Sequence, residues 1–239
     1  MRTSSLLTPL AVAALTVGAV VAAPLAASAA TPAPSASAHA PASLSDVQAR
    51  ATAAAGKQID ALTAQITRLT ANTGLTDDDR TKALAILNDD LDGIHALQSD
   101  IAAATTVKKV RTEVRTAATT YAVRKLALPE TRWAARVDDV TARALPRLQA
   151  EQQKLSAALA AHPDKSTSAL TDALSDLSTQ ISTAQTDANG LSASALALSP
   201  ATVAGDAGSL SHVRDQVKAL DTAVHTANQD AKTVRTGVK

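Results

Sequence analysis

One stretch of the chain decides the fold class: residues 170–198 read LTDALSDLSTQISTAQTDANGLSASALAL. Its apolar side chains return at spacings of three and four, at Leu170, Leu174, Leu177, Ile181, Ala184, Ala188, Leu191, Ala195 and Leu198. This spacing places them on one face of an α-helix. Gly190 is a weak point in the helix, but the pattern resumes directly after it. The stretch predicts a long amphipathic helix of the kind that packs in coiled coils.

The same periodicity covers most of the chain after residue 43. It predicts helices over about residues 44–72, 76–104, 107–126, 130–161, 166–198 and 210–236. Because the connections are short, consecutive helices should lie antiparallel, as hairpins over about 44–104, 106–161 and 166–236. We therefore expect an all-α fold: an elongated antiparallel helical bundle, or coiled-coil hairpins, with about six helices and one bundle domain over residues 44–239.

Local signals fix several helix ends. Ser45 with Gln48 has the spacing of a capping box at the start of the first helix. Three successive aspartates, residues 77–79, suit the N-terminal turn of the second helix, where the helix dipole favours anions. Pro146 lies inside an apolar pattern and should kink its helix, because it removes a backbone donor and crowds the preceding turn.

The core must be almost wholly aliphatic, since the chain has no Phe, one Trp and one Tyr. Tyr121 and Trp133 flank a corner that Pro129 makes between two helices. We expect these two aromatic side chains to pack together there, as the largest anchors of the core.

The first 30 residues have the three parts of an export signal. Arg2 supplies the positive charge, residues 6–21 the apolar stretch, and Ala27-Ser28-Ala29-Ala30 a small-residue cleavage site. Cleavage is the expectation, and retention as a membrane anchor is the alternative. Residues 31–43 form a Pro/Ala/Ser-rich linker. These features predict an extracellular or envelope-associated protein without a transmembrane segment after signal cleavage.

No pattern of catalytic or cofactor-binding residues occurs. The chain has no cysteine, its five histidines lie in separate segments, and it lacks phosphate-loop, dinucleotide and nucleophile-elbow motifs. Two acidic groups, residues 77–79 and 89–92, raise a calcium interpretation, but a helix N-terminus and a solvated helical face explain them better. We expect no enzyme, no cofactor and no metal site.

The charge is unevenly distributed. Residues 105–147 carry ten basic and four acidic side chains, although the formal net charge of the whole chain is only +1. This low total and the scarcity of aromatic residues argue against nucleic-acid binding. The basic middle segment predicts a possible anion-binding face of eight residues: Arg132, Arg136, Arg143, Arg147, Lys108, Arg111, Arg115 and Lys125. The alternative is that these side chains pair with acidic neighbouring helices.

The segment from Tyr121 to Leu128, followed by Pro129, Glu130, Thr131, Arg132 and Trp133, has the pattern Tyr-x-Val-x-x-Leu-x-x-Pro. In this it resembles uncharacterised exported Ala-rich helical proteins of high-G+C Gram-positive bacteria, over about residues 44–160. The resemblance implies a secreted or envelope-associated helical protein and brings no catalytic residues.

Two functions follow from these features as expectations. The first is a secreted or cell-envelope structural or interaction protein that presents coiled-coil surfaces to an anionic wall polymer or a protein partner. The second is an extracytoplasmic carrier of a small molecule or lipid that uses the interior of the bundle. The oligomeric state stays open, because the apolar stripes could be buried within one chain or between chains.

Overall fold

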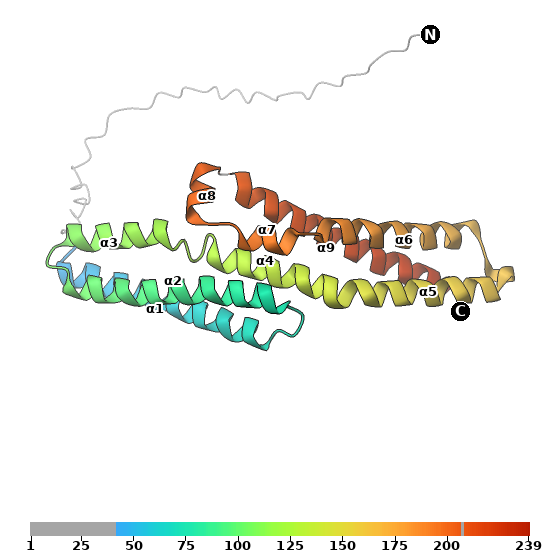
Figure 1. Ribbon diagram of the computed structural model, residues 1–239, viewed down its shortest axis with the longest axis horizontal. Coiled ribbons are helices and arrows are strands. Elements are labelled where there is room, and N and C mark those ends of the chain that lie inside the picture. The colour runs from blue at the N-terminus through green and yellow to red at the C-terminus, as the bar shows by residue number, and fades with distance from the viewer. Residues whose placement is uncertain (1–41, 207) are drawn as a thin grey trace, which may run out of the picture. The chain divides into compact units, whose positions relative to one another are not determined.

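The computed structural model describes residues 42–206 and 208–239, and every regular element within them is helical (Figure 1). The predicted all-α fold is confirmed. Six helical stretches are long, as expected. The predicted signal peptide lies outside the described residues, and so does nearly all of the linker.

Helices α1 (Leu44–Ala71) and α2 (Asp77–Ala103) form the first hairpin. Gln48, near the start of α1, donates from Nε2 to the carbonyl oxygens of Ile101 (2.9 Å) and Ala104 (3.0 Å) at the end of α2, so the two helices run antiparallel. This use of Gln48 replaces the predicted capping box. The N-cap of α1 is instead Ser43, whose Oγ accepts from the Asp46 amide at 3.1 Å.

Helix α3 (Val107–Thr120) is shorter than predicted and packs on α1 and α2. Its buried residues, Val110 and Ala117, face these two helices. The chain then turns at Ala122, which has a positive φ of 48°. The predicted middle hairpin over 106–161 is wrong, because α3 and the helix after it follow one another instead of lying side by side (Figure 1). The apolar stripe of α3 is already covered by the first hairpin.

A long helical stretch follows, made of α4 (Ala127–Asp139), a π-helical turn (Val140–Ala144) and α5 (Leu145–Ala161). Pro129 lies in its first turn, where a missing N–H breaks no helical hydrogen bond. Pro146 is accommodated by the π-helical turn, in which the Leu145 amide bonds back to the carbonyl oxygen of Val140. The predicted disturbance at Pro146 thus takes the form of a widened turn.

The predicted helix over 166–198 is broken at its glycine. A 3-10 turn (Pro163–Lys165) leads to α6 (Ser168–Ala188), and Gly190, with φ +70°, starts a separate short helix, α7 (Leu191–Leu196). Helix α8 (Pro200–Gly205) is also short, and α9 (Gly208–Gly237) closes the chain.

Helices α6 and α9 pack antiparallel: a Cβ added at Gly237, the end of α9, would lie 2.5 Å from Leu170 near the start of α6. Helix α9 runs parallel to α4 and α5. Arg136 pairs with Asp221 near the middle of α9, and Glu151 pairs with Arg235 near its end. Helices α6 and α9 therefore form the second hairpin, and α5 packs against both of them as a third helix.

The core is aliphatic, and its largest fully buried side chains include Leu62, Leu87, Leu177 and Leu220. Tyr121 and Trp133 are only half-buried, so the prediction that they are the largest anchors of the core is wrong. Tyr121 does have a packing role, because its ring lies directly on the backbone of Gly93 in α2.

Candidate functional site

The four predicted arginines of α4 and α5 lie on one long helical stretch, but three of them have partners within the protein. Arg136 pairs with Asp221 at 2.7 Å and with Asp139 at 3.7 Å. Arg143 pairs with Asp139 at 3.2 Å and also donates to the Thr73 hydroxyl. Arg132 donates from Nε to Gln65 at 3.4 Å, while Arg147 is exposed. Acidic and polar neighbours therefore occupy much of this basic stripe.

The predicted basic residues of α3 are placed differently. Lys108, Arg111 and Arg115 are exposed along α3, and Lys125 is exposed in the turn after it. Across residues 42–206 and 208–239, no salt bridge engages any of these four side chains. Of the eight predicted residues, Arg132, Arg136 and Arg143 thus have partners within the protein, whereas Arg147 and the four residues of α3 and the turn after it have no salt bridge.

Two of these residues, Arg111 and Arg115, border a groove between α1 and α3, here called the α3 groove. Its volume is about 460 Å³, and its lining consists of Val47, Arg50, Ala51, Val110, Arg111, Val114, Arg115 and Ala118. Val114, 37% exposed, is the one large apolar side chain that is exposed in the described part of the chain. An apolar floor between three guanidinium groups can hold an anionic group together with apolar surface.

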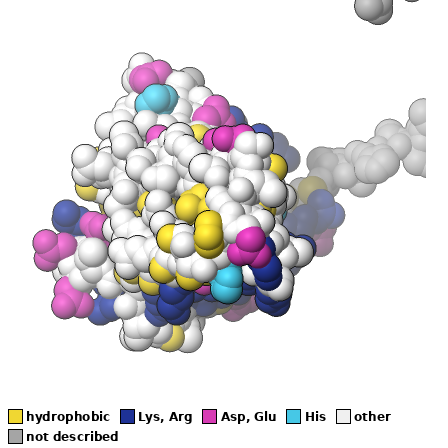
Figure 2. Space-filling model, turned by 90° about the vertical axis from the view of Figure 1, so that its right-hand side faces the viewer, with side chains coloured by type: hydrophobic (Ala, Val, Ile, Leu, Met, Phe, Trp, Pro, Cys, Tyr) yellow, Lys and Arg dark blue, Asp and Glu magenta, His cyan; other side chains and the backbone are white. Residues whose placement is uncertain are grey.

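On another face of the molecule, side chains of both charges occur together. Figure 2 shows the end where α5 passes into α6, and there Lys and Arg are interspersed with Asp and Glu. Interspersed charges of both signs give a weak net field. The α3 groove therefore differs from this face in having cations without acidic neighbours in its lining.

A second feature is absent from the sequence predictions: paired carboxylates between α2 and α4. Asp79 faces Asp138 near one end of this contact, and Asp90 faces Glu130 near the other. Because the residue number rises along α2 as it falls along α4, these two helices are antiparallel here. The short helix α7 packs over both of them.

Asp79 and Asp138 are held by hydrogen bonds. The Ser192 hydroxyl of α7 donates to Asp79 Oδ2 at 2.7 Å, and the Thr76 amide donates to Asp138 Oδ2 at 3.1 Å. Burial raises the pKa of Asp138 above its ordinary value, and the nearby charge of Asp79 adds to this effect. The acidic group at residues 77–79 therefore lies in the first turn of α2, as predicted, and one of its members, Asp79, also contacts the buried Asp138.

Asp90 and Glu130 lack such support. Glu130 is 2% exposed and Asp90 is 9% exposed, and the buried atoms Glu130 Oε2 and Asp90 Oδ2 have no hydrogen-bond partner. Burial raises the pKa of Glu130 to about 8, with a further contribution from the charge of Asp90. Burial likewise raises the pKa of Asp90 to about 7, helped by the charge of Asp89. The prediction that residues 89–92 form a solvated face is wrong for Asp90.

A cleft opens beside the Asp79–Asp138 contact. It measures about 790 Å³ and lies between the start of α2, the end of α4, the π-helical turn, the start of α5, the end of α6, and α7. Its polar lining consists of Asp79, Asp138, Thr141, Gln149, Gln185, Thr186, Asn189 and Ser192. No Lys or Arg lines it, so the cleft presents carboxylates, amides and hydroxyls to a ligand.

Sequence reasoning missed both carboxylate pairs. Each joins residues far apart in the chain, and only the packing of α4 on α2 brings them together. One local signal was available: Glu130 lies between apolar residues in ALPETRWAA (residues 127–135), on the same helical face as Ala134 and Val137. That register predicts a buried carboxylate in α4 but gives no partner for it.

Within the described residues, no three His, Cys, Asp or Glu side chains come close enough to hold a metal ion. None of the helices described combines the length and the apolar character needed to span a bilayer.

Comparisons with known proteins leave the site to be interpreted from its geometry. The chain matches no family model, no curated protein and no solved structure.

Proposed function

We propose that this chain is an exported interaction protein that binds an anionic partner of the cell envelope through the α3 groove. One observation carries the proposal. The arginines of α4 and α5 are largely paired within the protein, whereas Arg111 and Arg115 of α3 and Arg50 of α1 border an apolar groove without a salt bridge among the described residues.

The groove suits a partner that carries both phosphate and apolar groups. Arginine binds phosphate oxygens with two parallel hydrogen bonds, and several guanidinium groups close together raise the local concentration of anions. Val110 and Val114 supply an apolar floor that pairing with a bare polyanion would leave unused. An anionic wall polymer of the teichoic-acid kind, with its lipid-linked end, has both properties.

Retention on purified anionic cell-wall material tests this proposal. The triple variant Arg50→Gln, Arg111→Gln, Arg115→Gln should elute at lower salt than wild type, because each lost phosphate contact reduces the number of counterions released on binding. Arg132→Gln, Arg143→Gln, Arg147→Gln removes the same charge from α4–α5 and serves as the matched control. Equal weakening in both variants, or stronger weakening in the control, would contradict binding through the α3 groove.

A second candidate function rests on the cleft beside Asp79 and Asp138. Its volume of about 790 Å³ falls within the range of small-molecule sites, and its polar groups converge from six elements. This supports a carrier of a polar small molecule. Ala193→Leu, which places a larger side chain in the cleft from an exposed position, should abolish such binding, while Ser194→Leu on the same helix should not.

A further inference from the structure

The carboxyl groups of Asp90 and Glu130 each have a buried oxygen that receives no hydrogen bond from the described protein. Buried carboxylate oxygens are normally hydrogen-bonded, and an unsatisfied buried acceptor destabilises the folded state. Here two such oxygens, Glu130 Oε2 and Asp90 Oδ2, are buried without a partner, and both residues line the same small cavity. Neither carboxylate has a salt bridge within the described residues.

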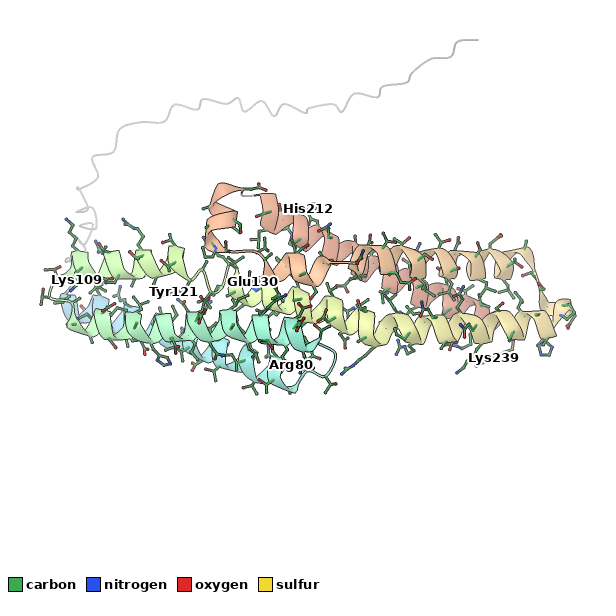
Figure 3. The ribbon with its side chains drawn as sticks, viewed as in Figure 1. Arg80, Lys109, Tyr121, Glu130, His212 and Lys239 are labelled. Atoms are coloured by element: carbon green, nitrogen blue, oxygen red, sulfur yellow. The ribbon has the colours of Figure 1, made fainter. Side chains whose placement is uncertain are left out.

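The cavity is small and connects to solvent. It measures about 190 Å³ and lies between α2, the end of α3, the start of α4, and the segment that joins α7 to α8. Asp89 is exposed and also lines the cavity, so a third carboxylate stands where a ligand would enter. Figure 3 marks Tyr121 and Glu130 at this junction of α3 with α4.

The lining defines the charge of the ligand. Three carboxyl groups and no Lys, Arg or His contribute to it, so the lining favours a cation over an anion. A metal ion fits poorly, because the described residues bring no three metal-binding side chains to one point. An ammonium group fits better, since it offers three N–H donors and needs no fixed coordination geometry.

The apolar part of the lining indicates what the ammonium group is attached to. Ile86, Leu198 and Pro200 form apolar surface beside the carboxylates, which suits a short alkyl chain. We propose that this cavity binds the primary ammonium group of an alkylamine, with Asp90 and Glu130 accepting its N–H bonds. The same chemistry occurs in a small amine and in the end of a lysine side chain. The proposal is independent of the α3 groove.

Calorimetric titration of the full chain with ethylammonium chloride tests the site at about pH 8. One saturable site is expected, and binding should release protons, because burial leaves the carboxylate pair partly protonated near this pH. Proton release appears as a binding enthalpy that changes with the ionisation enthalpy of the buffer. Nα-acetyl-lysine amide, titrated in parallel, tells a lysine side chain from a small amine.

Two variants of the same helix provide the control. Asp90→Asn should weaken ethylammonium binding about tenfold or more, the scale of a lost charge-assisted hydrogen bond. Asp92→Asn removes the same charge from an exposed position outside the cavity and should bind as wild type does. Glu130→Gln provides a second test if Asp90→Asn fails to fold.

Three results would overturn the proposal. The first is an absence of saturable ethylammonium binding, which would mean that the pair holds only a shared proton. The second is equal weakening in Asp90→Asn and Asp92→Asn, which would indicate non-specific attraction. The third is tight binding of calcium chloride that ethylammonium does not displace, which would make the cavity a metal site.

Discussion

At the scale of single residues, Asp90 and Glu130 place negative charge where the fold excludes water. Both carboxyl groups lie on buried positions of otherwise apolar helix faces, so the folded chain favours their neutral forms. Asp79, three helical turns before Asp90 on α2, and Asp138 on α4 are better satisfied, because a hydroxyl donates to Asp79 and a backbone amide donates to Asp138. The contact between α2 and α4 thus has one satisfied carboxylate pair and one unsatisfied pair.

Replacing Glu130 by Gln is expected to stabilise the protein at alkaline pH. Because the pKa of Glu130 rises from 4.5 to about 8 on folding, the folded chain retains a proton that the unfolded chain loses between these values. The free energy of unfolding therefore falls as the pH rises through this interval. Above about pH 8, the free energy of unfolding of Glu130→Gln should exceed that of wild type by about 1 to 3 kcal/mol. Below about pH 4, the two free energies of unfolding should be equal.

Urea denaturation above about pH 8 and below about pH 4 measures the difference in unfolding free energy between Glu130→Gln and wild type. Asp92→Asn, an exposed change on α2, should show no comparable gain at alkaline pH. A Glu130→Gln difference that is the same at both pH values would point to altered packing and would contradict an effect of ionisation.

At the scale of elements, the helices follow their local sequence closely, and the exceptions occur where the backbone departs from the regular α-helix. The periodicity predicts α1, α2 and α9 well, and Thr76 caps α2 as its position suggests. The breaks at Ala122 and Gly190 depend on left-handed backbone conformations that periodicity does not report. Which helix covers which was less predictable, because α3 buries its stripe on α1 and α2 instead of on α4.

The contact of α2 with the end of α3 gives an element-scale prediction. A methyl group at Gly93 would collide with the ring of Tyr121, so Gly93→Ala should destabilise the protein by about 1–3 kcal/mol although Ala favours helices. Gly56→Ala is the matched control in α1: its nearest neighbour would be Gln98 Nε2 at 4.0 Å. That control should gain about 0.5–1 kcal/mol from helix propensity alone.

Thermal denaturation compares these variants. In a Tyr121→Ala background, Gly93→Ala should no longer destabilise, because the colliding ring is gone. Persistence of the full loss in that background would show that Tyr121 is not the cause.

At the scale of the whole described chain, the stretch from α4 through α5 belongs to two packing groups. Its first half contacts α1, α2 and α7 as well as α9, and its second half contacts α6 and α9. Ion pairs to α9 occur in both halves, Arg136–Asp221 in α4 and Glu151–Arg235 in α5. The two groups therefore share one backbone, and damage in one group should be felt in the other.

Leu220→Ala tests this coupling. Leu220 is fully buried in α9, so its truncation should cost about 2–5 kcal/mol. Urea unfolding followed by helical circular dichroism and by the fluorescence of Trp133 in α4 should still show one coincident transition, moved to lower urea. Loss of helicity well before the fluorescence change would show that the C-terminal helices unfold separately.

The shared helix also determines where the molecule can be divided. A cut before Ala127 separates α1–α3 from α4–α9, but it uncovers the apolar side chains of Ala134 and Val137 on one fragment and those of Leu87 and Ile94 on the other. A cut after Ala144 would instead divide the π-helical turn from α5. After either cut, each of the two fragments would carry half of an interface. When mixed, the two fragments should associate with each other and regain their folded structure.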